Sequence, residues 1–177
     1  MVILADRGRL SFLQAAFIAG CIVGLSTGER GFAADHEQLR QEGARHYSAG
    51  RYFQAIEAFE KALAGAPEEA REPVKGDLAH ALAGLGFEYL SESEGRMAEE
   101  TFRRAIGVSE DYYANFGLGY LFFTRREDGE ARTYLLSSLG SRRDYAPTHK
   151  LLGLLDYRKG LTKEAIDRLS LSLRLDP

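Results

Sequence analysis

Several residue types are scarce in this chain of 177 residues, and each scarcity narrows what the protein can be. There is one cysteine, so no disulfide can form within the chain. Tryptophan is absent, proline occurs four times, and the formal net charge is only −3. Hydrophobic residues make up 45% and charged residues 28%. This composition excludes a disulfide-stapled fold, a disordered chain and a strongly basic nucleic-acid binder, and it suffices for one domain or a short repeat array with a buried core.

Residues 1–34 differ from the rest of the chain and have the order of an export signal. Arg7 and Arg9 precede an apolar stretch over residues 10–25, and small residues follow at 31–34. Basic, then apolar, then small is typical of a secretory signal peptide, and the apolar stretch is shorter than the roughly 20 residues of a membrane-spanning helix. We predict a signal cleaved after Ala33 or Ala34, with a retained membrane anchor as the alternative.

A third possibility for this segment is lipidation. Ile18-Ala19-Gly20-Cys21 resembles a bacterial lipoprotein signal in which Cys21 carries the lipid, although the apolar run continues past Cys21. All three possibilities predict a bacterial protein exported to the periplasm or held at an envelope membrane.

The rest of the chain repeats one pattern at nearly constant spacing. A glycine is followed 12 residues later by an alanine in four copies. The glycines are Gly43, Gly86, Gly119 and Gly153, and the alanines are Ala55, Ala98, Ala131 and Ala165. A large side chain then follows four residues after the alanine, as Phe102 does after Ala98. This periodicity predicts two amphipathic helices per copy, which must stack on the neighbouring copies to bury their apolar faces.

The motifs Leu85-Gly86-x-x-Tyr89 and Leu118-Gly119-x-x-Phe122 resemble the signature of tetratricopeptide repeat (TPR) proteins. The resemblance implies an all-α superhelix of helix-turn-helix repeats with a concave inner face. We expect the repeats at residues 36–69, 79–111, 112–145 and 146–177. The intervening segment 70–78 is either a longer loop or an N-terminal extension of the next helix, and we favour an extension that begins after Pro73.

Motifs for catalysis or for metal binding are not found in the sequence. The four histidines, at 36, 46, 80 and 149, have no metal-ligand spacing, and neither a nucleophile elbow nor a Walker-type loop occurs. Arginine pairs at 103–104, 125–126 and 142–143 are diluted by acidic neighbours. The sequence therefore predicts no enzyme, no cofactor and no binding of nucleic acid.

The candidate binding surface is aromatic. In TPR proteins particular positions of each first helix line the concave face, and the resemblance places aromatic side chains at many of them. We predict the partner-binding residues to be Tyr47, Phe87, Phe116, Tyr120, Phe123 and Tyr157. The alternative is that these rings are core residues between repeats. Ala44, Gly84 and Phe87 stand where a carboxylate-clamp TPR has polar residues, so we expect a protein or peptide with apolar anchors instead.

Three functions are compatible with this pattern. The first is a non-enzymatic scaffold of the bacterial envelope that binds a partner segment in its aromatic groove. The second is an assembly element that forms homo-oligomers through its C-terminal helix, because Leu169, Leu171, Leu173 and Leu175 spread around that helix and no further capping helix follows. The third is the non-catalytic part of a larger envelope enzyme system.

Overall fold

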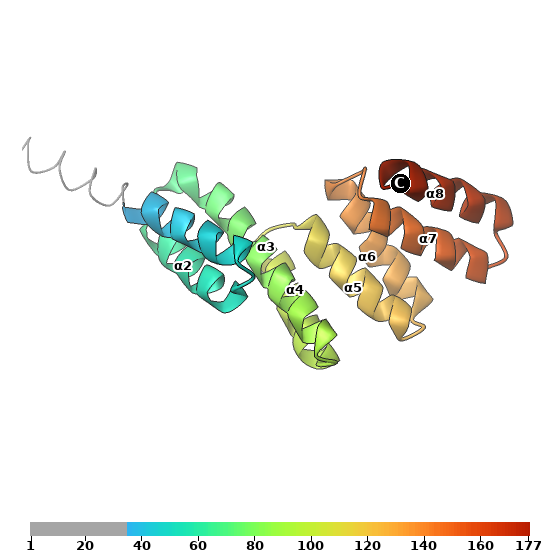
Figure 1. The fold of residues 1–177 in the computed structure, drawn as a ribbon, viewed down its shortest axis with the longest axis horizontal. Helices are drawn as coiled ribbons and strands as arrows, with labels where there is room; N and C mark the ends of the chain where they lie inside the picture. Colours follow the sequence, from blue (N-terminus) through green and yellow to red (C-terminus); the bar gives the residue numbers. More distant parts are fainter. Residues whose placement is uncertain (1–34) are drawn as a thin grey trace, which may run out of the picture.

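The computed structural model describes residues 35–177, which are helical throughout apart from the turns, with no strand in that range (Figure 1). Residues 35–48 are helical and are followed by seven further helices. These are α2 (Tyr52–Gly65), α3 (Glu68–Ser91), α4 (Gly95–Val108), α5 (Tyr112–Thr124), α6 (Asp128–Ser141), α7 (Ala146–Arg158) and α8 (Thr162–Leu175). The predicted all-α class is confirmed.

The predicted export segment, including Cys21, falls within residues 1–34 and so lies outside the described residues. In the part of the chain that the structure describes, no helix combines the length and the apolar character needed to cross a membrane.

The helices pair into four hairpins, and the turns of all four have the same geometry. One residue in each turn has a positive φ, namely Gly50 (69°), Ser93 (66°), Arg126 (65°) and Gly160 (76°). Its amide donates to the carbonyl three residues earlier, and the next amide donates to the carbonyl five residues earlier, as in Arg51 N to His46 O at 2.9 Å. These are Schellman C-caps, which satisfy the last carbonyls of the first helix and reverse the chain.

Glycine lets the two helices of each hairpin approach closely. A Cβ built on Gly86 would lie 2.5 Å from the ring of Phe102, and one on Gly43 would lie 2.7 Å from the ring of Phe59. Gly119 and Gly153 stand in the same relation to Leu135 and Leu169 in the later hairpins. The large side chain of each second helix therefore fills the space left by the glycine of the first, which explains the spacing seen in the sequence.

The hairpins stack because their core side chains also reach the next hairpin. The ring of Phe102 on α4 is fully buried and lies against Gly86 of α3 and Gly117 of α5. The first helices α3, α5 and α7 contact one another in turn. The result is a core cluster that runs along the array from α2 to α7, as expected for a solenoid, with a second, smaller cluster formed by Ala62, Ala66 and Val74.

The segment between the first two repeats is helical, but its helix starts earlier than expected. Helix α3 begins at Glu68, directly after Pro67, and not after Pro73. Pro67 supplies the extended backbone at the N-cap, its carbonyl accepts from Ala70 N at 2.9 Å, and Glu68 and Glu69 lie in the positive field of the first turn. Pro73 cannot donate a backbone hydrogen bond inside this helix, and the burial of Val74 in a cluster with Ala62 and Ala66 further stabilises the segment.

Candidate partner-binding site

Four of the six predicted binding residues come together in one network of rings. The ring centroids of Phe87 and Phe116 lie 5.9 Å apart, and those of Phe116 and Tyr120 lie 6.5 Å apart. Tyr47 joins through His80, whose ring centroid is 5.4 Å away. Within residues 35–177, Phe123 and Tyr157 lie outside this network. We call this network, together with Tyr112, Tyr113 and Tyr145, the aromatic face.

The aromatic face also includes tyrosines that the sequence argument did not select. Tyr113 packs against Phe87 with centroids 4.4 Å apart, and Tyr145 packs edge-on against Phe116 at 5.1 Å. Tyr112 lies 5.1 Å from Tyr145. Tyr112 and Tyr113 open α5 and Tyr145 immediately precedes α7, so these rings come from the junctions between hairpins. The signal that could have found them is a tyrosine directly after an aspartate where two consecutive repeats begin, as in Asp111-Tyr112 and Asp144-Tyr145.

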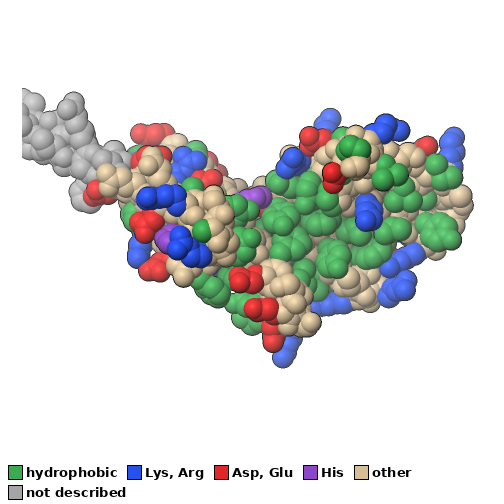
Figure 2. All heavy atoms as spheres, viewed as in Figure 1, with side chains coloured by type: hydrophobic (Ala, Val, Ile, Leu, Met, Phe, Trp, Pro, Cys, Tyr) green, Lys and Arg blue, Asp and Glu red, His purple; other side chains and the backbone are tan. Residues whose placement is uncertain are grey.

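Exposure separates the rings into two groups. Phe87, Phe116 and Tyr47 are half-buried, whereas Tyr120 is 41% exposed and Tyr157 is 68% exposed. Hydrophobic side chains gather over α5 and α7 on the face shown in Figure 2, and the surface is hollowed where the first hairpin meets this region. The half-buried rings therefore form the floor of the aromatic face, with Tyr120 exposed at its edge, and Tyr157 is exposed outside the network.

Burial changes the acidity of the tyrosines in the network. It raises the pKa of Tyr47 to about 12 and that of Tyr145 to about 12, and the surrounding tyrosines add to the effect. Burial likewise raises the pKa of Tyr113. The phenols stay protonated over the whole physiological range, so the surface offers neutral rings and hydroxyl groups.

Arginines cover part of the aromatic surface from the side of the later repeats. The guanidinium of Arg158 lies 3.8 Å from the ring centroid of Phe123 and bonds Asp128 Oδ1 at 2.7 Å. The guanidinium of Arg142 lies 4.9 Å from the ring centroid of Tyr112 and donates to its hydroxyl at 2.8 Å. Phe123 is half-buried under its arginine, so it offers a partner less free surface than Tyr120 does.

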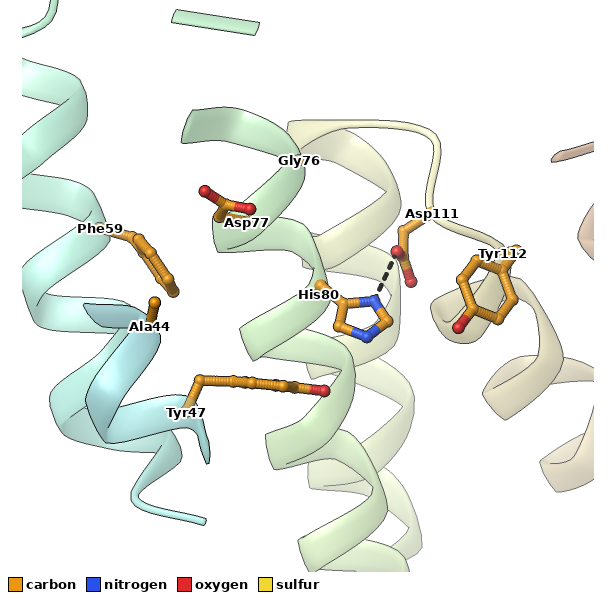
Figure 3. Close-up of a pocket in the computed structure, with 8 residues that line it drawn as sticks. All are labelled: Ala44, Tyr47, Phe59, Gly76, Asp77, His80, Asp111 and Tyr112. Atoms are coloured by element: carbon orange, nitrogen blue, oxygen red, sulfur yellow. Dashed lines mark hydrogen bonds and ion pairs between the residues drawn. The ribbon is translucent and has the colours of Figure 1, made fainter. Parts of the chain in front are cut away.

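A cavity of about 450 Å³ lies at the end of the aromatic face nearest the first hairpin. It is lined by Ala44, Tyr47, Phe59, Gly76, Asp77, His80, Asp111 and Tyr112. Figure 3 shows these residues converging from the first hairpin, from α3 and from the start of α5. The carboxylate of Asp111 accepts from Ala114 N at 2.7 Å through Oδ1 and from His80 Nδ1 at 3.0 Å through Oδ2. Asp111 therefore caps α5 and fixes the ring of His80 at once.

Residues 35–177 also bear on two other kinds of site, a metal centre and a basic patch. In that range no group of three or more histidine, cysteine, aspartate or glutamate side chains is placed to hold a metal ion. At least one arginine of each pair is engaged in an ion pair: Arg104 bonds Glu60, Arg125 bonds Glu99 at 2.6 Å, and Arg142 bonds Asp144 at 3.3 Å.

Comparison with solved structures identifies the architecture. The chain is similar to the crystal structure of MamA, with a TM-score of 0.53 and 18% sequence identity over 95% of this chain and 96% of that one. It is also similar to PilF of Pseudomonas aeruginosa, with a TM-score of 0.54 and 22% identity over 82% of this chain and 63% of that one. A further structure, MamA AMB-1, has a TM-score of 0.51 and 21% identity over 80% of this chain and 73% of that one.

No protein-family model matches the sequence, and no curated protein matches it closely enough to count as a relative. The structural likeness, at these identities, establishes the fold. The fold is that of tetratricopeptide repeat proteins, so the TPR resemblance and the superhelix of helical hairpins are confirmed.

Proposed function

We propose that this chain is a non-enzymatic, protein-binding scaffold of the bacterial cell envelope, which holds an apolar segment of a partner on its aromatic face. The observation that carries the proposal is the exposure of Tyr120 at the edge of the packed rings, together with that of Tyr157 on α7 outside the network. Exposed aromatic side chains on a rigid support are the usual anchors of protein interfaces, because they bury large areas with few rotatable bonds. Phe116 contacts Tyr120 directly, and Phe87 packs against Phe116 in turn.

The experiment that tests this proposal is partner capture from envelope extracts with the full-length chain as bait. The informative variant is Tyr120→Ala with Tyr157→Ala, because both side chains are exposed and Tyr120 joins the ring network through Phe116, so the contacts among the remaining rings persist. The matched control is Leu136→Ala with Ile166→Ala, which removes two exposed apolar side chains from the second helices of their hairpins. We expect the first variant to lose the captured protein and the control to retain it, with circular dichroism unchanged in both. Equal capture by all three proteins would refute the proposal.

Export is part of the same proposal and rests on residues 1–34 alone. The cleavage predicted after Ala33 or Ala34 is checked by N-terminal sequencing of the protein recovered from cells. A mature N-terminus at Ala34 or Asp35 supports a cleaved signal, a lipid-modified Cys21 supports a lipoprotein, and an intact Met1 refutes both.

A second candidate function is self-assembly through the last hairpin. Leu173 is 69% exposed, and a cavity of about 440 Å³ lies between α7 and α8 beside it, lined in part by Ala146, Pro147 and Leu169. Light scattering over a concentration series tests this candidate. A rising mass that Leu173→Asp abolishes supports it, and a constant monomer mass excludes it.

A further inference from the structure

The cavity shown in Figure 3 has an uneven balance of charge. Its lining includes Asp77 and Asp111 but neither lysine nor arginine. Arg40 reaches Asp77 from outside the lining and bonds only Oδ2 through Nε, at 2.5 Å. The side chain of Asp77 remains 37% exposed. A carboxylate in this position can accept a further hydrogen bond from a guest in the cavity.

His80 adds an acceptor to the same wall. Because Nδ1 of His80 lies 3.0 Å from the carboxylate of Asp111, the proton of the neutral ring resides on Nδ1. Nε2 is then left with its lone pair. Asp111 itself is nearly buried, and both of its oxygens are engaged, so its role is to orient His80 and to add negative potential. The cavity lining therefore offers two hydrogen-bond acceptors, the carboxylate of Asp77 and Nε2 of His80, to a donor.

The remaining walls are aromatic. His80 lies between Tyr47 and Tyr112, with centroid separations of 5.4 Å and 5.8 Å, and Phe59 closes the side toward the first hairpin. Rings combined with acceptors are the surroundings that stabilise an organic cation, because the ring faces carry negative potential. The chain itself shows this preference nearby, where Arg142 stacks on Tyr112 and on Tyr145.

We propose that this cavity is a subsite for an arginine side chain of the bound partner segment, held by stacking on Tyr47 and by hydrogen bonds to Asp77 and His80. The proposal rests on the proposed function, since it places a cationic anchor at one end of the apolar surface that runs to Tyr120. A guanidinium fits better than an ammonium because it is planar, stacks on rings and donates several hydrogen bonds at once.

The electrostatics of the walls agree with a cationic guest. The raised pKa of Tyr47 has burial as its first cause, and the neighbouring tyrosines and Asp111 contribute as well. Burial disfavours a charge of either sign, so the contribution of Asp111 is the part of this shift that agrees with a positive charge in the same place. Arg40 and Arg142 are the basic groups that contact the wall residues, and neither lines the cavity.

The test compares two small probes that differ in charge and hardly in shape. N-acetylarginine methylamide and N-acetylcitrulline methylamide are titrated into the full-length chain, and the ring signals of histidine and tyrosine are followed by NMR. We expect the arginine probe to shift the signals of His80 and Tyr47 and to bind about 5- to 30-fold more tightly than the citrulline probe. Equal shifts with both probes, or none at His80, would overturn the proposal.

Two variants locate the binding. Asp77→Asn removes the accessible carboxylate and should weaken the arginine probe about 3- to 10-fold. Asp128→Asn is the matched control, because it removes a carboxylate that also pairs with an arginine but lies far along the array. Gly76→Gln fills the cavity without a change of charge, since no atom lies within 4 Å of a Cβ at this position, and should abolish the shifts. Undiminished binding by Gly76→Gln would overturn the proposal.

The outcome is separable from that of the proposed function. Tyr120→Ala with Tyr157→Ala leaves the cavity untouched, so the arginine probe should bind this variant normally. Loss of partner capture in that variant, together with equal binding of the two probes to the parent, would keep the proposed function and discard the arginine subsite. Retained capture by that variant together with selective arginine binding to the parent would discard Tyr120 and Tyr157 as anchors and keep the cavity as an arginine site.

Discussion

Gly117→Ala is expected to destabilise the protein, although alanine is the better helix former. Gly117 lies inside α5, and a Cβ there would meet three ring atoms of Phe102 at distances of 2.8 Å or less. The ring has little room to move, because a Cβ on Gly86 of α3 would meet the same three ring atoms at distances of 2.9 Å or less. The substitution therefore forces the two hairpins apart or drives Phe102 out of its rotamer.

The magnitude follows from two opposing contributions. Overpacking a tight core costs about 1–3 kcal/mol, and replacing glycine by alanine in a helix gains about 1 kcal/mol. Because the ring is fully buried and lies against both glycines, we expect the upper end of the cost and a net loss of about 2 kcal/mol. Gly76→Ala is the matched control, since its Cβ enters open space in the middle of α3. It should gain about 0.5–1 kcal/mol.

Urea unfolding followed by circular dichroism measures both variants. A double-mutant cycle with Phe102→Leu identifies the cause, because the smaller side chain makes room for the added methyl group. In that background Gly117→Ala should cost less than about 1 kcal/mol, which corresponds to a coupling of about 1 kcal/mol or more. If Gly117→Ala is as stable as Gly76→Ala, the close packing of the hairpins on Phe102 is refuted.

Three further predictions concern ionisation and the turns. The pKa of Tyr47 and that of Tyr145 are each about 12 in the folded protein, against 10.0 for free tyrosine. The free energy of unfolding should therefore fall as the pH rises from about 10 to about 12, and Tyr→Phe at either position should reduce this loss in alkaline unfolding curves. Hydrogen bonding to Arg125 lowers the pKa of Glu99. Glu99→Gln should therefore cost about 0.5 kcal/mol of stability at neutral pH, and nothing at an acidic pH where the carboxylate is protonated. Urea unfolding at neutral and at acidic pH measures the difference. Arg126→Gly should raise the free energy of unfolding by about 1 kcal/mol, because it relieves a positive φ of 65°, and an unchanged melting curve would contradict this.

Much of the fold follows from short-range pattern. The glycine and the alanine 12 residues later determine which helices pair, and the contact of Gly86 with Phe102 shows why the spacing is kept. The turns are harder to predict than the helix pairs, because the residue with a positive φ is glycine at only two of the four turns. In the second hairpin it is Ser93 and not the nearby Gly95. The Schellman hydrogen bonds hold Ser93 in the left-handed conformation although it carries a side chain. The residue types alone do not show that these hydrogen bonds override the preference for glycine.

The candidate site was predictable only in part, because it depends on contacts between repeats. Repeat positions within first helices led to Phe87, Phe116 and Tyr120, which do meet in one network. The repeat positions could not predict that Arg158 covers Phe123, because this contact joins two consecutive hairpins. Tyr145 was missed for a related reason, because it precedes its helix and reaches Phe116 only once α7 stacks on α5.

The most direct test of the central claim is site-specific crosslinking inside the cell that makes the protein. A photoreactive phenylalanine analogue is placed at Tyr120, on the aromatic face, or at Leu136, which is similarly exposed on the second helix of the same hairpin. The account predicts a discrete crosslinked partner from position 120 and none from position 136. A partner joined at position 136 alone, or an adduct at position 120 that contains only a second copy of this chain, would contradict it.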